Sequence, residues 1–226
     1  MPEAHAPPLG FGRARPPGPE RGLAALCARD PILAAIEPQS GPLPWRRRAR
    51  GFPGLLQAMC GQQISNQAAA AIWRRLAALP GATTAEGLAR LPDAALRDAG
   101  LSRRKITHAR ALAAAFAEGR LSDAGLAAMD DEAAIAAIAR VPGFGRWSGE
   151  IYLLFALERE DVFPAGDLAL AAAAAALYGL PTRPREAALR TFADIWRPWR
   201  SLAARLLWHH WRFVTGRPSM DDLPPT

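Results

Sequence analysis

The chain has 226 residues, half of them hydrophobic and 8% aromatic, which is long and apolar enough to bury a core and excludes a disordered polymer. The formal net charge is +7 at pH 7, and Lys105 is its only lysine; this excess of arginine favours a polyanionic partner, although solvated helix faces would give the same composition. Cys27 and Cys60 have no Cys or His at metal-ligand spacing, which excludes a zinc site and an iron–sulfur cluster.

Alanine-rich runs and few β-branched residues predict an all-α protein. The segment 1–20 is rich in Pro, Gly and Arg, so we expect a flexible tail there, a helical domain over 21–215 and a second tail over 216–226. The sequence has no apolar run of membrane-spanning length and no secretory signal. We therefore expect a cytoplasmic protein with no membrane partner.

The first predicted helices cover 22–36, where the dipeptide Asp30-Pro31 is a typical helix start and divides the segment in two. A basic loop with one aromatic residue follows at 45–50. Such a loop could lie along a nucleic-acid backbone, but a solvated linker is slightly favoured because nothing in the sequence fixes the geometry of the loop.

A long helical region is predicted over 54–79, where apolar residues recur at helical spacing. The polar segment 60–67 interrupts it. Ser65 could cap a new helix there, with the glutamines solvated. Alternatively, Gln62 and Gln63 could contact base edges or fill a gap in a duplex, because a Gln amide both donates and accepts hydrogen bonds. The pattern leaves both interpretations open.

Short helices are expected over 84–91, 93–98, 106–116 and 122–129. Ser102 is a plausible N-cap for the third of them, which makes the cations at 103–105 a solvated first turn or, as the less favoured alternative, a phosphate-binding group.

The segment 141–147 reads Val-Pro-Gly-Phe-Gly-Arg-Trp and lies between two helical patterns. Proline fixes φ, and glycine tolerates positive φ, so this segment predicts a tight hairpin between two helices. The hairpin would direct amide N–H groups outward at the start of its second helix, where an anion such as phosphate is favoured. An ordinary interhelical turn would have the same sequence.

Asp167 directly precedes a strongly helical run over 168–178. It is either a simple N-cap or a carboxylate that the helix dipole holds ionised for electrostatic or basic catalysis, and its local sequence does not separate the two. Further helices are expected over 182–196 and 202–213. Adjacent His209 and His210 in the last helix point in different directions, so we reject a metal site there.

Four motifs together resemble the DNA-3-methyladenine glycosylase II family of the helix-hairpin-helix DNA glycosylase superfamily. The resemblance covers roughly residues 30–213. The motifs are Gly61-Gln62-Gln63-Ile64-Ser65, the hairpin 141–147, Asp161-Val162-Phe163-Pro164 before Asp167, and Pro198-Trp199-Arg200-Ser201 up to Trp208. The resemblance implies an all-α, two-lobed helix-hairpin-helix glycosylase fold with a base-binding cleft between the lobes.

The same resemblance implies roles for individual residues. The essential aspartate of the family falls on Asp167, the base pocket would include Trp147, Trp208 and Gln62, and Gln63 would be the wedge that enters the gap left by a flipped nucleotide. The hairpin residues implied to hold DNA are Pro142, Gly143, Gly145 and Arg146. The main-chain carbonyls implied to hold a monovalent cation, Na⁺ or K⁺, are those of Ala139, Val141 and Phe144.

Members of the superfamily that also cut the strand use a lysine nucleophile near the hairpin, where this chain has Trp147. The resemblance therefore implies a monofunctional glycosylase that releases alkylated purines from double-stranded DNA. Ile151 and Gly166 stand where relatives often have a pocket tyrosine and a second acidic residue. We expect a monomer that is associated with the nucleoid and requires no cofactor. The alternatives are a non-catalytic DNA-binding protein and a glycosylase for neutral lesions such as uracil or hypoxanthine.

Overall fold

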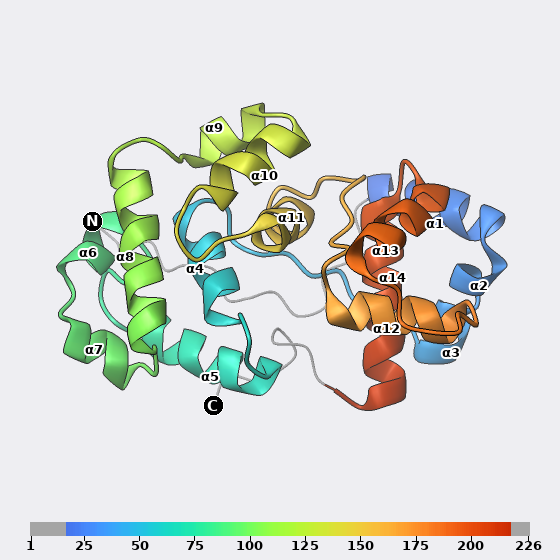
Figure 1. Ribbon diagram of the computed structural model, residues 1–226, viewed down its shortest axis with the longest axis horizontal. Coiled ribbons are helices and arrows are strands. Elements are labelled where there is room, and N and C mark those ends of the chain that lie inside the picture. The colour runs from blue at the N-terminus through green and yellow to red at the C-terminus, as the bar shows by residue number, and fades with distance from the viewer. Residues whose placement is uncertain (1–16, 218–226) are drawn as a thin grey trace.

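The computed structural model describes residues 17–217, and every regular element within this range is a helix (Figure 1). This confirms the all-α prediction. None of the described helices is long and apolar enough to span a bilayer.

Two hydrophobic cores divide the helices into two lobes (Figure 1). The middle lobe is continuous in sequence and contains α4 (Phe52–Cys60), α5 (Asn66–Ala77), α6 (Ala85–Arg90), α7 (Asp93–Asp98), α8 (Arg103–Ala117), α9 (Asp123–Ala128) and α10 (Asp131–Ala139). The split lobe joins the two ends of the chain and contains α1 (Pro17–Arg29), α2 (Pro31–Ala34), α3 (Ile36–Ser40), α12 (Leu168–Leu177), α13 (Glu186–Phe192), the 3₁₀ helix η1 (Ala193–Trp196) and α14 (Arg200–Thr215). The two-lobed prediction is therefore confirmed.

Helix α11 (Arg146–Phe155) connects the lobes (Figure 1). Its residues Tyr152 and Leu153 are buried in the core of the middle lobe, whereas Leu154 is buried in the core of the split lobe. One helix therefore contributes to both cores, and this shared burial fixes the position of the hairpin that precedes it.

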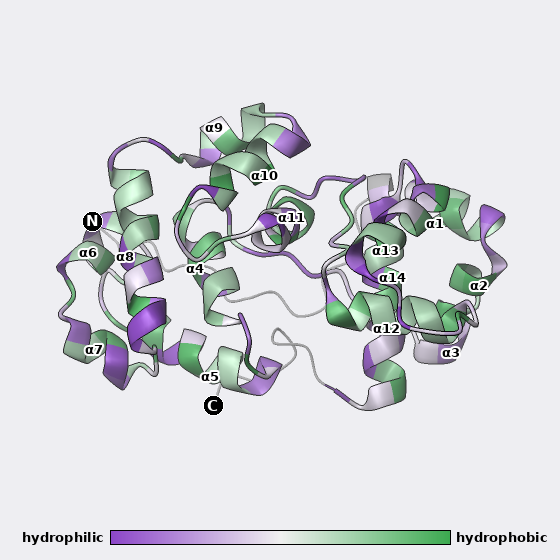
Figure 2. Ribbon diagram, in the orientation of Figure 1, coloured by the Kyte–Doolittle hydropathy of each residue, from purple (hydrophilic) through white to green (hydrophobic). Residues whose placement is uncertain are grey.

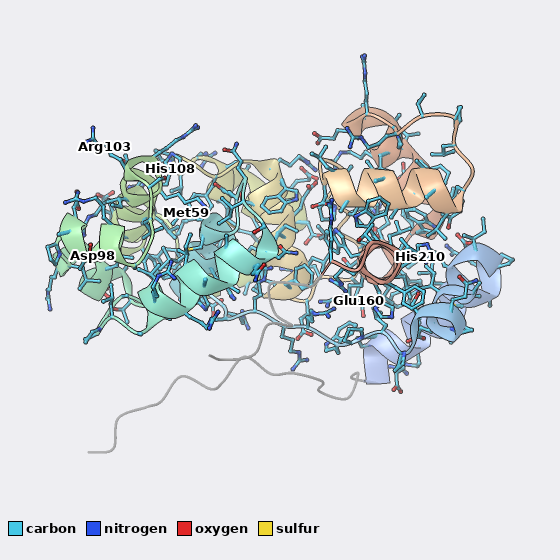
Figure 3. All side chains as sticks on the ribbon, turned by 90° about the horizontal axis from the view of Figure 1, so that it is seen from below. Met59, Asp98, Arg103, His108, Glu160 and His210 are labelled. Carbon is cyan, nitrogen blue, oxygen red and sulfur yellow. The ribbon has the colours of Figure 1, made fainter. Side chains whose placement is uncertain are left out.

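The distribution of apolar residues matches this division. Figure 2 shows hydrophobic residues along α4 and throughout α12, whereas hydrophilic residues gather on α7 and the adjacent part of α8. Met59 and His210, labelled in Figure 3, mark the two lobes on opposite sides of the molecule. Eight of the nine residues of α4 are buried, so this helix is the centre of the middle lobe rather than an amphipathic surface helix.

Several predicted helix starts are confirmed. Asp30 caps α2 through hydrogen bonds from the amides of Ile32 and Leu33. Ser65 caps α5, so the long helical region does divide at the polar segment, and Ser102 caps α8. These side-chain oxygens satisfy amides that have no partner within their own helix.

The single helix expected over 182–196 is wrong. The structure has α13 from Glu186, followed by the 3₁₀ helix η1. Pro184 explains the later start, because it lacks an N–H donor and pushes the preceding residue toward extended backbone. At the N-terminus, α1 begins at Pro17, inside the segment expected as a tail over 1–20. The remaining parts of the two expected tails, 1–16 and 218–226, lie outside the described residues.

Candidate active site

A cleft of about 780 Å³ lies between the lobes and takes its lining from both of them. The middle lobe contributes residues of α4, α8 and the turn at 61–64, and α11 contributes one face. The split lobe contributes Asp167 and part of α14. Lining side chains include Gln57, Gln62, Lys105, His108, Trp147, Ile151, Phe155, Asp167, Arg205 and Trp208.

Asp167 is the N-cap of α12 and at the same time part of the cleft wall. Its Oδ1 accepts hydrogen bonds from the amides of Ala169 at 2.9 Å and Leu170 at 3.0 Å. The N-cap interpretation is therefore confirmed, and the catalytic interpretation stays a prediction for the same carboxylate. The cap fixes the carboxylate, and the cleft makes it reachable.

Two tryptophans from different helices also donate to this carboxylate. Trp208 Nε1 of α14 lies 3.1 Å from Oδ1, and Trp147 Nε1 of α11 lies 3.1 Å from Oδ2. The half-buried carboxylate of Asp167 thus accepts four N–H hydrogen bonds, three on Oδ1 and one on Oδ2. The Oδ2 oxygen retains acceptor capacity for a further donor such as water.

The structure therefore brings three of the predicted site residues together, namely Asp167, Trp147 and Trp208. It also adds Phe155, which the sequence did not indicate and whose ring stacks on that of Trp208 with centroids 5.6 Å apart and an interplanar angle of 27°. The Arg48 guanidinium lies over the same Phe155 ring at 5.1 Å. The cleft is consequently lined by aromatic rings close to the carboxylate.

Arg205 was also not indicated by the sequence, although a single arginine within the apolar run Leu202 to Leu207 is a usable signal. Its side chain is buried and donates to the carbonyls of Arg46 at 2.8 Å and Leu154 at 3.0 Å. The guanidinium also lies 4.2 Å from the centroid of the Trp45 ring. Burial lowers the pKa of Arg205 to about 9. This arginine therefore joins the loop before α4 to the end of α11 at the wall of the cleft.

Gln62, expected in the base pocket, lines the cleft but uses its amide to hold the hairpin. Its Nε2 donates to the carbonyl of Gly143 at 3.0 Å and to Ser148 Oγ at 3.1 Å. Because these bonds join the end of α4 to the hairpin, Gln62 has a positioning role that the sequence did not reveal.

Gln63, expected as the wedge, is exposed at the edge of the cleft. Its φ of +59° places it in the left-handed region, which is uncommon for a residue other than glycine. Holding a non-glycine residue there costs on the order of 1 kcal/mol or more. Gln63 therefore lies at the edge of the cleft in a strained backbone conformation.

The hairpin at 141–147 has the predicted glycine geometry. Gly143 has φ +89°, and a Cβ there would lie 2.1 Å from the ring of His108, so only glycine fits. In contrast, nothing lies within 4 Å of a Cβ built at Gly145, and this N-cap of α11 has no side-chain hydrogen bond. The amides at the start of α11 therefore lack a side-chain cap, on an open surface that suits an anion.

Arg146 was expected to contact DNA, but the structure engages it elsewhere. Its two Nη atoms form a bidentate pair with Glu132 at 2.8 and 2.6 Å, and its Nε lies 3.0 Å from Glu150. Hydrogen bonding from Arg146 lowers the pKa of Glu132. Burial raises the pKa of Glu150, which also accepts from Arg190 at 2.8 Å. Arg146 therefore ties α10 and α11 together, which leaves its predicted DNA contact without support from this geometry.

Two cationic side chains and one histidine of α8 line the cleft beside the hairpin instead. Arg104, Lys105 and His108 all contribute to the lining, and Figure 3 labels His108 on this helix. Lys105 Nζ donates to the carbonyl of Cys60 at 2.7 Å. Burial lowers the pKa of Lys105, and burial together with Arg104 lowers the pKa of His108.

The carbonyls expected to hold a monovalent cation belong to the hairpin, and that of Val141 accepts a hydrogen bond from the Phe144 amide at 3.0 Å. The binding of a monovalent cation by the carbonyls of Ala139, Val141 and Phe144 stays a prediction. Within residues 17–217, no group of three or more His, Cys, Asp or Glu side chains could hold a metal ion.

Comparison with known protein families gives a match to the model described as "HhH-GPD superfamily base excision DNA repair protein" over residues 56–199. The chain belongs to this family. The matched range includes the second half of α4, the hairpin, Asp167 and the start of the Pro198-Trp199-Arg200-Ser201 motif, and therefore most of the cleft wall. This member of the HhH-GPD superfamily has its hairpin and its capped aspartate on the same cleft.

Individual relatives agree with this assignment. The chain is 31% identical over 161 residues to DNA-3-methyladenine glycosylase 1 of Schizosaccharomyces pombe, covering 70% of this chain and 71% of that protein. The solved structure of the S. pombe 3-methyladenine DNA glycosylase Mag1 in complex with abasic DNA matches with a TM-score of 0.77 at 27% identity, covering 83% of this chain and 95% of that one. A DNA-3-methyladenine glycosidase structure from Bacillus halodurans matches with a TM-score of 0.71 at 28% identity, covering 94% of this chain and 98% of that one.

Proposed function

We propose that this HhH-GPD protein is a monofunctional DNA glycosylase of base excision repair that hydrolyses the N-glycosidic bond of alkylated purines such as 3-methyladenine and 7-methylguanine. One observation carries the proposal. The Asp167 carboxylate is fixed in the interlobe cleft by two helix amides and two indole N–H groups. The similarity to 3-methyladenine DNA glycosylases supports the choice of substrate.

The reaction needs little from the protein beyond this carboxylate. An alkylated purine that carries positive charge is already a good leaving group, so its departure requires little acid assistance. As the base leaves, the sugar becomes an oxocarbenium ion. Asp167 would stabilise that ion by opposite charge, and the free acceptor capacity of Oδ2 would orient or deprotonate the attacking water.

The aromatic lining suits a cationic base. The rings of Trp147 and Trp208 contribute to the lining of the cleft, and the face of an indole ring attracts a cation through the ring quadrupole. The target nucleotide must first leave the duplex, which costs a few kcal/mol and costs least for a damaged base. Gln63, held in strained backbone at the cleft mouth, would occupy the space that the nucleotide leaves.

The DNA strand would be held beside the hairpin. The amides around Gly143 and Gly145 would bind a phosphate at the open start of α11, and Arg104 on α8 would add positive charge to that side of the cleft. A formal net charge of +7 favours association with double-stranded DNA and with the nucleoid. We propose that the protein acts as a monomer.

The product would be an abasic site, not a cut strand. Superfamily members that cut the DNA strand use a lysine nucleophile. The only lysine of this chain is Lys105, whose Nζ donates a hydrogen bond to the Cys60 carbonyl. The proposed reaction uses no cofactor. The hairpin carbonyls of Ala139, Val141 and Phe144 would hold a structural Na⁺ or K⁺ at most.

The test is Asp167→Asn, assayed on duplexes that each carry one lesion: 3-methyladenine, 7-methylguanine, uracil or hypoxanthine. Asparagine caps helices about as well as aspartate does, so the fold is kept while the negative charge is lost. We expect release of the methylated bases to fall by about 10²- to 10³-fold or more, with DNA affinity unchanged or higher.

Two results would contradict the proposal. If the wild-type protein binds duplex DNA but releases none of the four bases, it is a DNA-binding protein without catalysis. If it releases only uracil or hypoxanthine, the substrate class is wrong although the enzyme class holds.

A further inference from the structure

Gln57 is a buried polar side chain for which the fold provides no partner. It lies in α4, its exposed fraction is 1%, and neither its Nε2 nor its Oε1 has a hydrogen-bond partner. Its neighbours in the helix, including Leu55, Leu56 and Met59, are apolar and buried. An amide buried without a partner destabilises a protein, so its presence here calls for an explanation outside the packing of the core.

The position of Gln57 relates it to the cleft. Helix α4 runs antiparallel to α11, since the Gly51 amide donates to Tyr152 Oη near one end and Gln62 Nε2 donates to Ser148 Oγ near the other. Gln57 therefore lies beside the turn of α11 that follows Trp147. Its side chain contributes to the lining of the cleft that contains Asp167.

The other two glutamines at the cleft differ from Gln57. Gln62 spends its Nε2 on the hairpin and on Ser148, and Gln63 is exposed to solvent. Only Gln57 combines burial with an unused donor and an unused acceptor among these three. Such a group in a binding cleft is best explained by a ligand that supplies the missing partners.

We propose that Gln57 hydrogen-bonds the edge of the purine base held in the cleft and thereby contributes to base selection. A purine edge presents a donor beside an acceptor: the exocyclic amino group of adenine with a ring nitrogen, or the O6 of guanine with its ring N–H. A carboxamide complements either order, because rotation by 180° exchanges its oxygen and its nitrogen. Rotation about the side-chain bonds of Gln57 directs the amide toward the entering base.

This inference rests on the proposed function. Within the site, it assigns different parts of base recognition to the indole rings and to Gln57. The indole faces respond to the positive charge of the base, whereas the neutral amide of Gln57 responds to the pattern of donors and acceptors on its edge. Gln57 would therefore matter for adenine-type and guanine-type lesions alike, because it can satisfy both patterns.

The experiment uses Gln57→Leu in the full-length chain, with Gln67→Leu as the matched control, since Gln67 is exposed and does not line the cleft. Three quantities are measured: the single-turnover rates of 3-methyladenine and 7-methylguanine release, the affinity for a duplex that contains an abasic site, and Tm. The abasic duplex lacks the base, so its affinity reports on the rest of the DNA interface.

For Gln57→Leu we expect both release rates to fall at least about tenfold, the loss of one good base-edge contact. The abasic-site affinity stays within about twofold, and Tm rises by a few degrees because an unsatisfied amide is removed. Gln67→Leu changes none of the three.

Release rates that remain within twofold of wild type would overturn the inference while leaving the proposed function intact. A lower Tm together with weaker abasic-site binding would also overturn it, by showing that Gln57 only supports packing. If the wild-type protein releases neither base, the proposed function fails and the inference fails with it.

Discussion

Asp167 in the cleft and Asp30 in the split lobe have almost the same local chemistry. Each caps a helix, and each Oδ1 accepts two backbone amides, those of Ile32 and Leu33 for Asp30. Each carboxylate also accepts an indole N–H, which Trp196 supplies to Asp30 at 2.9 Å. The second partner of Asp30 Oδ2 is the hydroxyl of Tyr178 at 2.5 Å.

The two aspartates differ in where the carboxylate lies. Asp30 is absent from the cleft lining, and its Oδ2 partners, Tyr178 and Trp196, pack against or within the core of the split lobe. Asp167 lies between the lobes, and its indole donors line the cleft together with it. A capped, hydrogen-bonded aspartate is therefore a common structural device, and only its placement on a cleft gives it a candidate chemical role.

The largest expected effect separates the two residues directly. Asp30→Asn should leave base release within about twofold of wild type at a temperature where the variant is folded, whereas Asp167→Asn lowers release by about 10²- to 10³-fold or more. Asp30→Asn should instead lower the free energy of unfolding by about 1–3 kcal/mol, because the Trp196 N–H loses its acceptor. Single-turnover release and urea unfolding measure the two quantities. Comparable losses of release in both variants would show that the cap, and not the cleft, is what matters.

The tryptophan donors offer the next contrast. Trp208→Phe keeps a ring in the cleft but removes a donor to Asp167, and it should slow base release by about ten- to a hundredfold, since a charge-assisted hydrogen bond is worth about 1.5–3 kcal/mol. Trp196→Phe should slow release little and cost about 1–3 kcal/mol of stability through the lost hydrogen bond and reduced packing. The release rate and the urea midpoint are measured for both variants. A fully active Trp208→Phe would count against the positioning of Asp167 by its indole partners.

A smaller effect is expected from the hydroxyl that only Asp30 has. Tyr178→Phe should lower the free energy of unfolding by about 1–2 kcal/mol, because the lost hydrogen bond has a charged acceptor. Base release should not change, since Tyr178 is not part of the cleft lining. A urea titration beside the release assay tests this, and a release rate that fell with stability unchanged would connect Asp30 to the active site after all.

The weakest expected effect is a dependence on alkaline pH in each lobe. Burial raises the pKa of Tyr152 in the middle lobe to about 12, and burial together with the Asp30 carboxylate raises the pKa of Tyr178 in the split lobe. Both tyrosines therefore bind their protons more tightly in the folded state. This difference in proton binding contributes to the free energy of unfolding. The contribution is complete below the ordinary tyrosine pKa of about 10 and is lost as the pH rises through the folded-state pKa.

The expected loss is up to about 1.4 kcal/mol per pH unit for each tyrosine above pH 10. Urea unfolding at several pH values from 8 to 12 measures it. Tyr152→Phe and Tyr178→Phe should each flatten the decline, and a stability profile that is flat above pH 10 in the wild-type protein would contradict the prediction.

Much of this protein could be predicted from local rules. The caps at Asp30, Ser65 and Ser102 and the glycine turn at the hairpin follow from backbone sterics and from side-chain oxygens that satisfy neighbouring amides. The start of α13 at Glu186 also has a local cause, because Pro184 disfavours helix at the residue before it. The combination of motifs also predicted which aspartate belongs to a cleft, although no single motif did so.

The sequence by itself thus determined most of the helices, the caps at Asp30, Ser65 and Ser102, and the family resemblance, because these depend on residues close together along the chain. Tertiary structure alone decided that Trp147 and Trp208 meet on one carboxylate, that Arg146 is paired with glutamates, and that Gln57 is buried without a partner. These facts depend on how α4, α11, α12 and α14 pack across two lobes. Contacts between residues distant in sequence arise from burial of the cores as a whole, which no local pattern encodes.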